Sequence, residues 1–223
     1  QKTKIDKWFL HQFKFLADLD IMELYNNQKI NLLKQEGFSD EQIAYSVNIS
    51  ELDVRNQRVD YHIIPTYKMV DTCAAEFKSE TPYCYSTYEL ENEIESFKEK
   101  SILILGGGPN RIGQGIEFDY CCVQAVFGLQ ELGFKTIMVN CNPETVSTDF
   151  DIADKLYFEP LTFEDVMNII DLENPFGVLI QFGGQTPLNI ANKLLEQGVN
   201  IIGTDPKSID LAEDRKKFGM ILD

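Results

Sequence analysis

The sequence has little of what marks several large classes of protein. Its five cysteines include no Cys-x-x-Cys pair and it has only two histidines, so neither a disulfide framework nor a zinc site is indicated. No apolar stretch approaches the roughly 18 residues that a membrane-spanning helix needs. Basic residues are scarce, because 20 lysines and arginines stand against 36 acids, for a net charge of -16. Such a charge repels phosphate backbones and anionic lipids, so we expect neither nucleic acid nor a membrane as a partner.

The composition that remains is typical of a globular protein. The 223 residues are 43% hydrophobic and 25% charged, enough to bury a core in one large or two modest domains. The first six residues lack the apolar segment of a secretory signal, and we expect a cytoplasmic location with reduced thiols. Nothing in the sequence supplies a base paired with a thiol, so we interpret three cysteines as small core residues rather than nucleophiles: Cys121, Cys122 and Cys141.

The chain changes character near residue 100, and the part before it is predicted to be helical. Two helix starts, at Ser39 and Ser50, each place a hydroxyl at a capping position with an amide or carboxylate three residues later. The two short helices flank a turn at Asn48, which also fits a DNA-reading helix-turn-helix. Residues 36–60 carry six acids and two arginines, however, and this charge favours docking to protein over binding to DNA.

A less regular stretch separates the helical part from the rest. Residues 65–95 hold Pro82 among several Tyr and Thr, which suits an extended connector packed on a neighbouring surface. Residues 89–100 hold five Glu and two Lys and are either a solvated helix face or a linker. We therefore predict a helical segment with its extended connector over 1–97 and a second domain over 98–223.

After residue 100, short apolar runs alternate with helical patterns. Strands are predicted at 102–105, 136–140, 156–158, 178–182 and 201–202. Helices are predicted between and after them, ending at Gly133, capped by Thr162, ending at Gly198 and opened by Pro206. This alternation is typical of the α/β class, with an open, mainly parallel, Rossmann-like sheet and helices on both faces. Ligands of such sheets gather at the carboxyl ends of the strands.

The loop after the first of these strands is rich in glycine. Glycines let the backbone approach a ligand closely, and this loop holds Gly106, Gly107, Gly108, Gly113 and Gly115, with Asn110 among them. It matches neither familiar phosphate cradle, because Arg111 replaces the third glycine of G-x-G-x-x-G and Gln114 replaces the Walker lysine. A sharp strand-to-helix turn would use the same glycines, so both interpretations stay open.

Two further loops follow successive strands. Residues 140–149 are polar with Glu144 in the middle, and an ordinary capped turn would also explain them. The strand at 178–182 is followed by Gly183, Gly184 and Gln185, where tight packing would explain the glycines. Each signal is weak when taken singly. Three such loops at one edge of a sheet favour a shared pocket or passage.

Longer strings of residues carry a resemblance to a known family. Residues 106–120 include the string Gly-Pro-Asn-Arg-Ile-Gly-Gln-Gly-Ile-Glu-Phe-Asp-Tyr and, together with 140–149, 185–187 and 212–215, resemble the large chain of carbamoyl phosphate synthetase. That large chain is a tandem duplication, and these loops resemble its second, carbamoyl phosphate synthetic half. Residues 70–83 resemble the end of its helical oligomerisation domain. The resemblance identifies 98–223 as a pre-ATP-grasp domain.

The resemblance implies a ligase activity for the intact enzyme. Bicarbonate is phosphorylated by one ATP, glutamine-derived ammonia attacks carboxyphosphate, and a second ATP phosphorylates the carbamate, for pyrimidine and arginine biosynthesis. Family members carry an ATP-grasp module after this domain, so we expect this chain to be a fragment that stops before it. The fragment is expected to be inactive alone, with no catalytic residue and no bound metal. ATP with Mg (or Mn) and K would bind elsewhere in the intact enzyme.

The resemblance also implies partners and a passage. The partners are the rest of the large chain, the glutamine amidotransferase small subunit, and further copies through the helical region. Carbamate is unstable in water, and the family passes it through an interior tunnel that excludes water. Residues matching Gly115, Glu117 and Glu144 line or gate this tunnel, and Arg111 is a candidate beside them. Alternatively, Arg111 pairs with Glu117 or Asp119 as a structural salt bridge.

One interpretation of another class stays open beside the synthetase. The chain could be an acidic helix-turn-helix interaction module fused to a Rossmann-like nucleotide-binding domain. The residues that follow position 223 in the parent gene would separate the two, because an ATP-grasp there supports the synthetase.

Overall fold

The chain folds into two compact units. The computed structural model describes residues 3–26, 28–77, 79–109, 111–113, 115–213, 216 and 218–219. Contacts between residues group 1–66 with 87–90 as a helical unit, and 67–86 with 91–223 as an α/β unit. Each unit has its own hydrophobic core.

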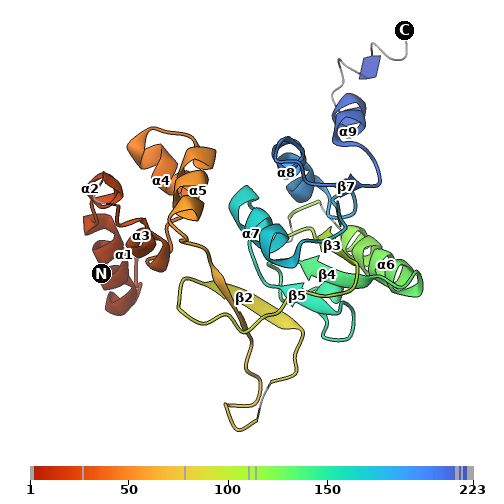
Figure 1. The fold of residues 1–223 in the computed structure, drawn as a ribbon, viewed down its shortest axis with the longest axis horizontal. Helices are drawn as coiled ribbons and strands as arrows, with labels where there is room; N and C mark the ends of the chain where they lie inside the picture. The colour runs from red at the N-terminus through yellow and green to blue at the C-terminus, as the bar shows by residue number, and fades with distance from the viewer. Residues whose placement is uncertain are drawn as a thin grey trace. The chain divides into compact units, whose positions relative to one another are not determined.

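Five helices make up the described part of the helical unit (Figure 1): α1 (Lys7–Asp18), α2 (Ile21–Asn26), α3 (Ile30–Gln35), α4 (Asp40–Val47) and α5 (Glu51–Asp60). Ser39 accepts the backbone N–H of Gln42 and Ser50 that of Asp53, each at 3.1 Å, and the third residue returns a bond in both cases. Asn48 adopts a left-handed φ of 59° and ends α4. The two predicted capped helices are therefore confirmed. The core of the unit comprises Leu33, Ile43, Ala44 and Val54.

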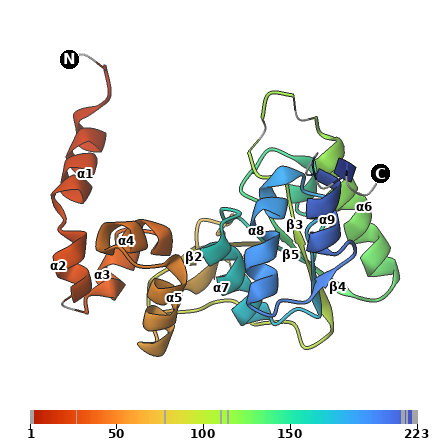
Figure 2. The same cartoon turned by 90° about the horizontal axis from the view of Figure 1, so that it is seen from above.

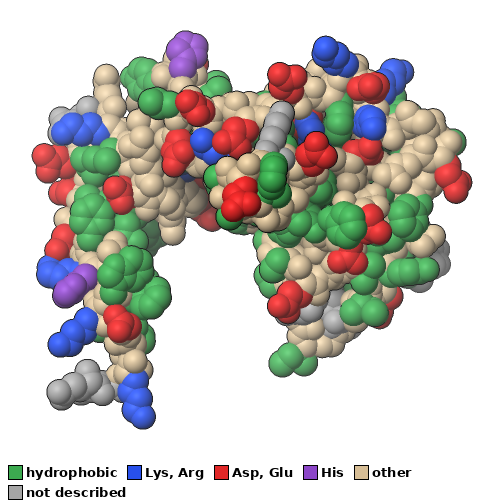
Figure 3. All heavy atoms as spheres, turned by 90° about the horizontal axis from the view of Figure 1, so that it is seen from below, with side chains coloured by type: hydrophobic (Ala, Val, Ile, Leu, Met, Phe, Trp, Pro, Cys, Tyr) green, Lys and Arg blue, Asp and Glu red, His purple; other side chains and the backbone are tan. Residues whose placement is uncertain are grey.

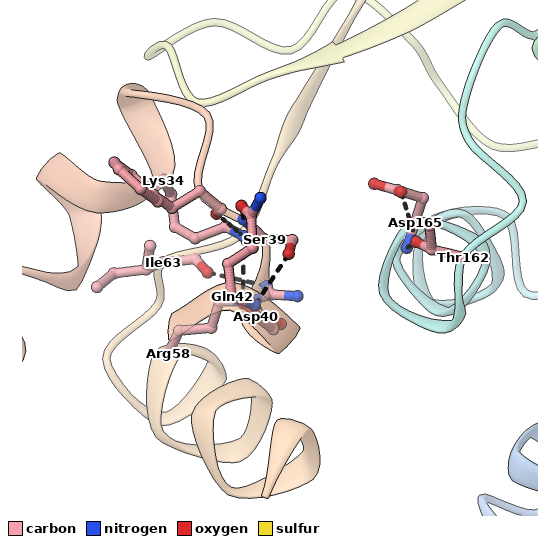
Figure 4. A network of polar contacts seen from close by, with 9 residues as sticks. Lys34, Ser39, Asp40, Gln42, Arg58, Ile63, Thr162 and Asp165 are labelled. Atoms are coloured by element: carbon pink, nitrogen blue, oxygen red, sulfur yellow. Dashed lines mark hydrogen bonds and ion pairs between the residues drawn. The ribbon is translucent and has the colours of Figure 1, made fainter. Parts of the chain in front are cut away.

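A buried ion network joins three of these helices (Figure 4). Asp40, at the start of α4, accepts two hydrogen bonds from Nε of Arg58 in α5, at 2.8 and 3.0 Å. The ammonium of Lys34 in α3 lies 3.2 Å from the same carboxylate and donates to the Phe38 carbonyl at 2.7 Å. Arg58 also donates to the Ile63 carbonyl at 3.2 Å. Two cations thus share one carboxylate inside the unit, where all three side chains are buried.

One seven-stranded sheet runs through the described chain in the order β1-β2-β5-β4-β3-β6-β7. The strands are β1 (Thr66–Met69), β2 (Tyr83–Thr87), β3 (Ser101–Leu105), β4 (Lys135–Val139), β5 (Lys155–Tyr157), β6 (Gly177–Leu179) and β7 (Ile201–Ile202). The pairs from β2 to β7 are parallel, and Leu103 of β3 lies opposite Ile137 on one side and Val178 on the other. Every residue of β3 is buried, as expected of a strand covered on both faces.

Helices cover both faces of this sheet (Figure 2). Helix α6 (Glu117–Glu131) packs on one face, where Cys122 and Val126 join Ile104 and Met138. On the other face α7 (Phe163–Glu173) and α8 (Gln185–Glu196) pack around a second set of strand residues: Leu103, Leu105, Ile137, Val139 and Val178. A short 3-10 helix, η1 (Val146–Thr148), follows β4, and α9 (Pro206–Glu213) follows β7. The predicted α/β class, with a mainly parallel sheet and helices on both faces, is confirmed.

The extended connector takes a larger part in the fold than its sequence indicates. Residues 66–69 and 83–87 are strands, and β2 pairs with β5 through Tyr83 opposite Leu156 and Cys84 opposite Tyr157. No helix forms over 89–100, so the interpretation of that acidic stretch as a solvated helix face is wrong. The domain boundary at residue 97 stays a prediction, while the contacts of the chain place most of the connector with the sheet.

The cysteines differ in environment. Cys122 and Cys84 are buried, and burial raises the pKa of each thiol to about 12, so both stay protonated near neutral pH. Cys141 is half-buried, but Cys121 is exposed, and its interpretation as a core residue is wrong. Neighbouring residues of a helix point about 100° apart, so only one of the two adjacent cysteines faces the sheet. None of the described helices is both long and apolar enough to cross a membrane.

Candidate functional site

Three loops lie together at the carboxyl edge of the sheet because the strands before them are neighbours. β3 lies between β4 and β6, and the three strands are parallel. The loops over 106–116, 140–145 and 180–184 therefore leave the same edge, where ligands of open α/β sheets bind. β6 ends at Leu179, three residues earlier than predicted, which lengthens the third loop.

Asn140 joins the first loop to the second. Its side chain is fully buried, and its Oδ1 accepts the backbone N–H groups of Gly108 and Asn142, both at 3.2 Å. Its Nδ2 donates to the hydroxyl of Ser147 at 3.3 Å. A methyl group on Gly106 would lie only 2.6 Å from this Nδ2, so that glycine makes room for the amide. One side chain thus fixes the start of both loops.

Asp119 and Ser147 form a second link that the sequence analysis did not find. Asp119, in the first turn of α6, accepts the backbone N–H of Ser147 at 2.8 Å and its hydroxyl at 2.5 Å. Both residues are buried. The pair is separated by 28 positions, and no local pattern indicates it.

The third loop contacts the first one. The Thr186 hydroxyl donates to the Gly107 carbonyl at 3.0 Å. A methyl group on Gly183 would lie 2.5 Å from the Leu105 carbonyl oxygen. Because this oxygen belongs to the backbone, it cannot move aside as a flexible side chain could, so the glycine allows close packing of the two segments. Gly184 caps α8 with a φ of 69°, and Gln185 is the first residue of that helix. The third loop therefore packs against the first loop and hydrogen-bonds it.

A small cavity opens between the first two loops. It has a volume of about 20 Å³, room for roughly one water-sized molecule. Its walls come from the glycine-rich loop, the start of α6 and the second loop: Gly107, Gly108, Pro109, Gly115, Ile116, Phe118, Asp119, Asn140 and Thr145. Two of the three predicted loops line it, and the third does not.

The remaining predicted residues lie near this cavity in different ways. Gly115 lines it, and Glu117, the exposed first residue of α6, holds its carboxylate beside Gly115, where an added methyl group would collide with it. Glu144 is exposed, and its backbone N–H donates to the Asn142 side chain at 3.0 Å. Arg111 is exposed, and within the described chain no ion pair joins it to Glu117 or Asp119.

Two glycine-loop residues complete the predicted set. Gly113 adopts a φ of 85°, a left-handed conformation that favours glycine. Asn110 lies outside the described residues. Among the residues that are described, no group of three His, Cys, Asp or Glu side chains gathers where it could hold a metal ion.

A fourth loop at this edge, after β5, carries a buried carboxyl group that the sequence analysis also missed. Glu159 is 5% exposed and accepts the backbone N–H of Ser86 in β2. Burial raises the pKa of Glu159 to about 7, although hydrogen bonds from Ser86 oppose the change, and the charge of Asp165 adds to it. This group titrates near neutral pH, whereas an exposed glutamate does not.

The surface agrees with the acidic composition. On the face seen in Figure 3, Asp and Glu side chains are scattered over both units, and Lys and Arg are interspersed among them. Proteins that bind nucleic acid instead gather basic side chains into a patch or stripe.

Family models match both parts of the chain. The model described as the carbamoyl phosphate synthase preATP-grasp domain matches residues 98–211, just over half of the chain. The model described as the carbamoyl-phosphate synthetase large chain, oligomerisation domain, matches residues 1–62.

Curated relatives agree with these models over nearly the whole chain. The carbamoyl phosphate synthase large chain of Neisseria meningitidis serogroup B is 56% identical over 230 residues, and that of Pasteurella multocida is 57% identical over 232. The chloroplastic, arginine-specific large chain of Arabidopsis thaliana is 51% identical over 240 residues. These matches cover 98–99% of this chain but only 20–21% of each relative, so the chain spans about a fifth of their length. The chain therefore belongs to the carbamoyl phosphate synthase preATP-grasp domain family.

Proposed function

We propose that this chain is part of a carbamoyl phosphate synthetase large chain of the glutamine-hydrolysing type. The intact enzyme would make carbamoyl phosphate from bicarbonate, glutamine-derived ammonia and two ATP, for pyrimidine and arginine biosynthesis. One observation carries the proposal: the relatives that match almost the whole chain at more than half identity are named carbamoyl phosphate synthase large chains. We therefore prefer this function to the alternative of an acidic helix-turn-helix interaction module fused to a nucleotide-binding domain.

The role proposed for the α/β unit is to form a wall of the carbamate passage near the second phosphorylation site. Gly115 has no side chain, and the carboxylate of its neighbour Glu117 lies in the place that a side chain would take beside the cavity. Glu144 extends from the loop on the other side. Carboxylates can hydrogen-bond a small polar solute. Arg111 is exposed and forms no ion pair with Glu117 or Asp119 within the described chain, so its guanidinium can offer a hydrogen-bond donor to an anionic solute.

The groups that act with this chain are proposed from the same family. ATP, with Mg or Mn and K, would bind in other parts of the large chain. The partners would be the rest of the large chain and the glutamine amidotransferase small subunit, with further copies through the segment that matches the oligomerisation domain. The free thiols of the described cysteines suit the cytoplasmic location we propose.

The passage is tested in the intact enzyme by Gly115→Phe. A benzyl group is far larger than a cavity of about 20 Å³, so it should block transfer while both ATP sites stay folded. Bicarbonate-dependent ATP hydrolysis and ATP formation from carbamoyl phosphate and ADP should survive, and overall synthesis should be lost. Glu117→Ala and Glu144→Ala should uncouple the reactions more mildly, because they remove polar partners without blocking the path.

Gly128→Phe is the matched control. Gly128 lies in α6, the helix that begins two residues after Gly115; it is exposed and has nothing within 4 Å of an added Cβ, so this variant should behave like the parent. Overall synthesis by Gly115→Phe at the parent rate would show that Gly115 does not line the passage. Loss of both partial reactions would show that the residue is structural. The chain by itself should show no ATP turnover dependent on bicarbonate or carbamate.

A further inference from the structure

We propose that Asp119 is a positioning residue for the passage: through Ser147 it holds the loop that carries Glu144 against the helix that carries Glu117. The inference rests on the function proposed above and adds to it a residue for which no role follows from the family assignment. The proposed role of Asp119 is to keep a fixed distance between the loop that carries Glu144 and the helix that carries Glu117.

The helix side of this link is a fixed reference. Asp119 lies two residues after Glu117, in the first turn of α6. The helix is anchored by Cys122 and Val126, which are both fully buried against the sheet. A carboxylate on the first turn therefore keeps its place relative to β3 and β4.

The loop side is held at one residue. Ser147 offers Asp119 two donors, its backbone N–H at 2.8 Å and its hydroxyl at 2.5 Å, and it is 1% exposed. The same hydroxyl oxygen accepts from Nδ2 of Asn140 at 3.3 Å, and Asn140 also holds Gly108 of the opposite wall. The contacts thus run from one wall of the cavity to the other through three buried side chains.

The segment between these fixed points is short. Asn140 begins the loop and Ser147 lies in η1, and Glu144 lies between them. The Thr148 hydroxyl and N–H both bond the Thr145 carbonyl, at 2.8 and 3.1 Å, which closes the turn beside Glu144. If Asp119 releases Ser147, the turn keeps its internal bonds but loses its attachment to α6, so Glu144 should move relative to Glu117.

The link also needs an acceptor at Asp119 more than it needs a charge. Both Ser147 donors are neutral, and the amide oxygen of an asparagine could still accept the backbone N–H. Asp119→Ala removes both acceptors and should release the loop. Asp119→Asn should restore much of the positioning. A role for the negative charge itself would give the opposite ranking, with Asn as impaired as Ala.

The experiment measures ATP hydrolysed per carbamoyl phosphate formed in the complete enzyme with its small subunit. Asp119→Ala should raise this ratio severalfold, and Ser147→Ala should raise it less, because its backbone N–H still bonds Asp119. The double variant should not exceed Asp119→Ala, and Asp119→Asn should return most of the way to the parent. Both partial reactions should continue in each variant. Glu131→Ala, an exposed acid at the far end of the same helix, is the matched control and should keep the parent ratio.

The outcomes separate this inference from the proposed function. Gly115→Phe that uncouples together with Asp119→Ala that stays coupled would overturn the positioning role and leave the passage in place. Gly115→Phe that stays coupled would remove the passage and the inference with it. Loss of the partial reactions in both Asp119 variants, or an Asn variant as uncoupled as Ala, would also overturn the positioning role.

Discussion

Each unit of the chain buries an aspartate at the start of a helix, and the two are compensated in different ways. Asp40 in the helical unit meets the guanidinium of Arg58 and the ammonium of Lys34. Asp119 in the α/β unit meets the N–H and O–H of Ser147. The first carboxylate is paired with two cations, whereas the second is held by neutral donors and lines a cavity.

The difference shows what each arrangement can do. A buried carboxylate with two cationic partners stabilises one packing of three helices, because removing it leaves two buried cations without their shared anion. A carboxylate held by neutral donors is less costly to disturb, since each hydrogen bond to a charged group contributes roughly 1.5–3 kcal/mol. The first arrangement suits a scaffold, and the second suits a loop whose position matters.

The largest expected effect is that of Asp40→Ala. It should lower the free energy of unfolding of the helical unit by about 3–5 kcal/mol, because Arg58 and Lys34 stay buried without the carboxylate. Hydrogen exchange of the α4 and α5 amides measures this directly. A loss below about 1 kcal/mol would mean that the Asp40 network contributes no more to stability than an exposed ion pair, and the two units would then not differ in how firmly they hold their buried aspartates.

The next effect concerns Glu159 and depends on pH. Its pKa rises from 4.5 to about 7 on folding, so the folded unit binds this proton more tightly than the unfolded chain. The resulting stability is fully present below about pH 4.5 and is lost as the pH rises through about 7. Glu159→Gln removes this loss, so relative to the parent it should gain on the order of 3 kcal/mol between pH 4 and pH 8.

Urea unfolding of the parent and Glu159→Gln chains at several pH values, followed by far-UV circular dichroism, measures this difference. Glutamine can still accept the Ser86 N–H, so the native contact is retained. Parallel pH profiles for the two chains would mean that Glu159 titrates like an exposed acid, and that carboxylates held by neutral donors carry no such cost.

A smaller effect is expected from Ser147→Ala. It removes the hydroxyl that donates to Asp119 and accepts from Asn140 but keeps the backbone N–H, so the α/β unit should lose about 1–2 kcal/mol. Ser208→Ala, at an exposed position of α9, is the control for the substitution itself. A loss as large as that of Asp40→Ala would show that neutral donors can hold a carboxylate as firmly as cations do.

The smallest effect is expected from Asp18→Ala, which breaks the exposed pair between Lys14 and Asp18 in α1. Both side chains are well solvated, so the change should be within about 0.5 kcal/mol and should shrink further in salt. Thermal unfolding at low and high ionic strength tests it. A loss above about 1 kcal/mol would mean that exposure does not separate this pair from the Asp40 network.

The features that the sequence could predict are local ones. Ser39, Ser50 and Thr162 were expected to cap helices, and each accepts the backbone N–H of the third residue along the chain. Such a cap involves only four consecutive residues, so its pattern can be recognised from the sequence alone (Figure 4 shows Ser39 and Thr162). The buried strand β3 was equally clear from its unbroken apolar run.

The features that it could not predict depend on pairing across the fold. Asp40 and Arg58 are 18 positions apart and Asp119 and Ser147 are 28 apart, and an isolated acid gives no sign of its distant partner. Strand β2 was also missed as a member of the sheet, because its five residues show no clear alternation: only Cys84 is buried and only Tyr85 is exposed. The loops could be placed at one edge, but which of them line the cavity depended on side chains such as Asn140.

The pairing of β2 with β5 bears on how this module can be inherited or exchanged. The matched family domain begins at residue 98, but the strand that covers the edge of β5 lies before it. A chain cut at residue 98 would expose the backbone N–H and C=O groups along the edge of β5, and such an unpaired edge can pair with strands of other molecules. It would also take away the Ser86 N–H that Glu159 accepts. A gene rearrangement that moved the domain intact would therefore have to carry residues 67–97 with it, so part of the segment between the two family domains would travel with the second.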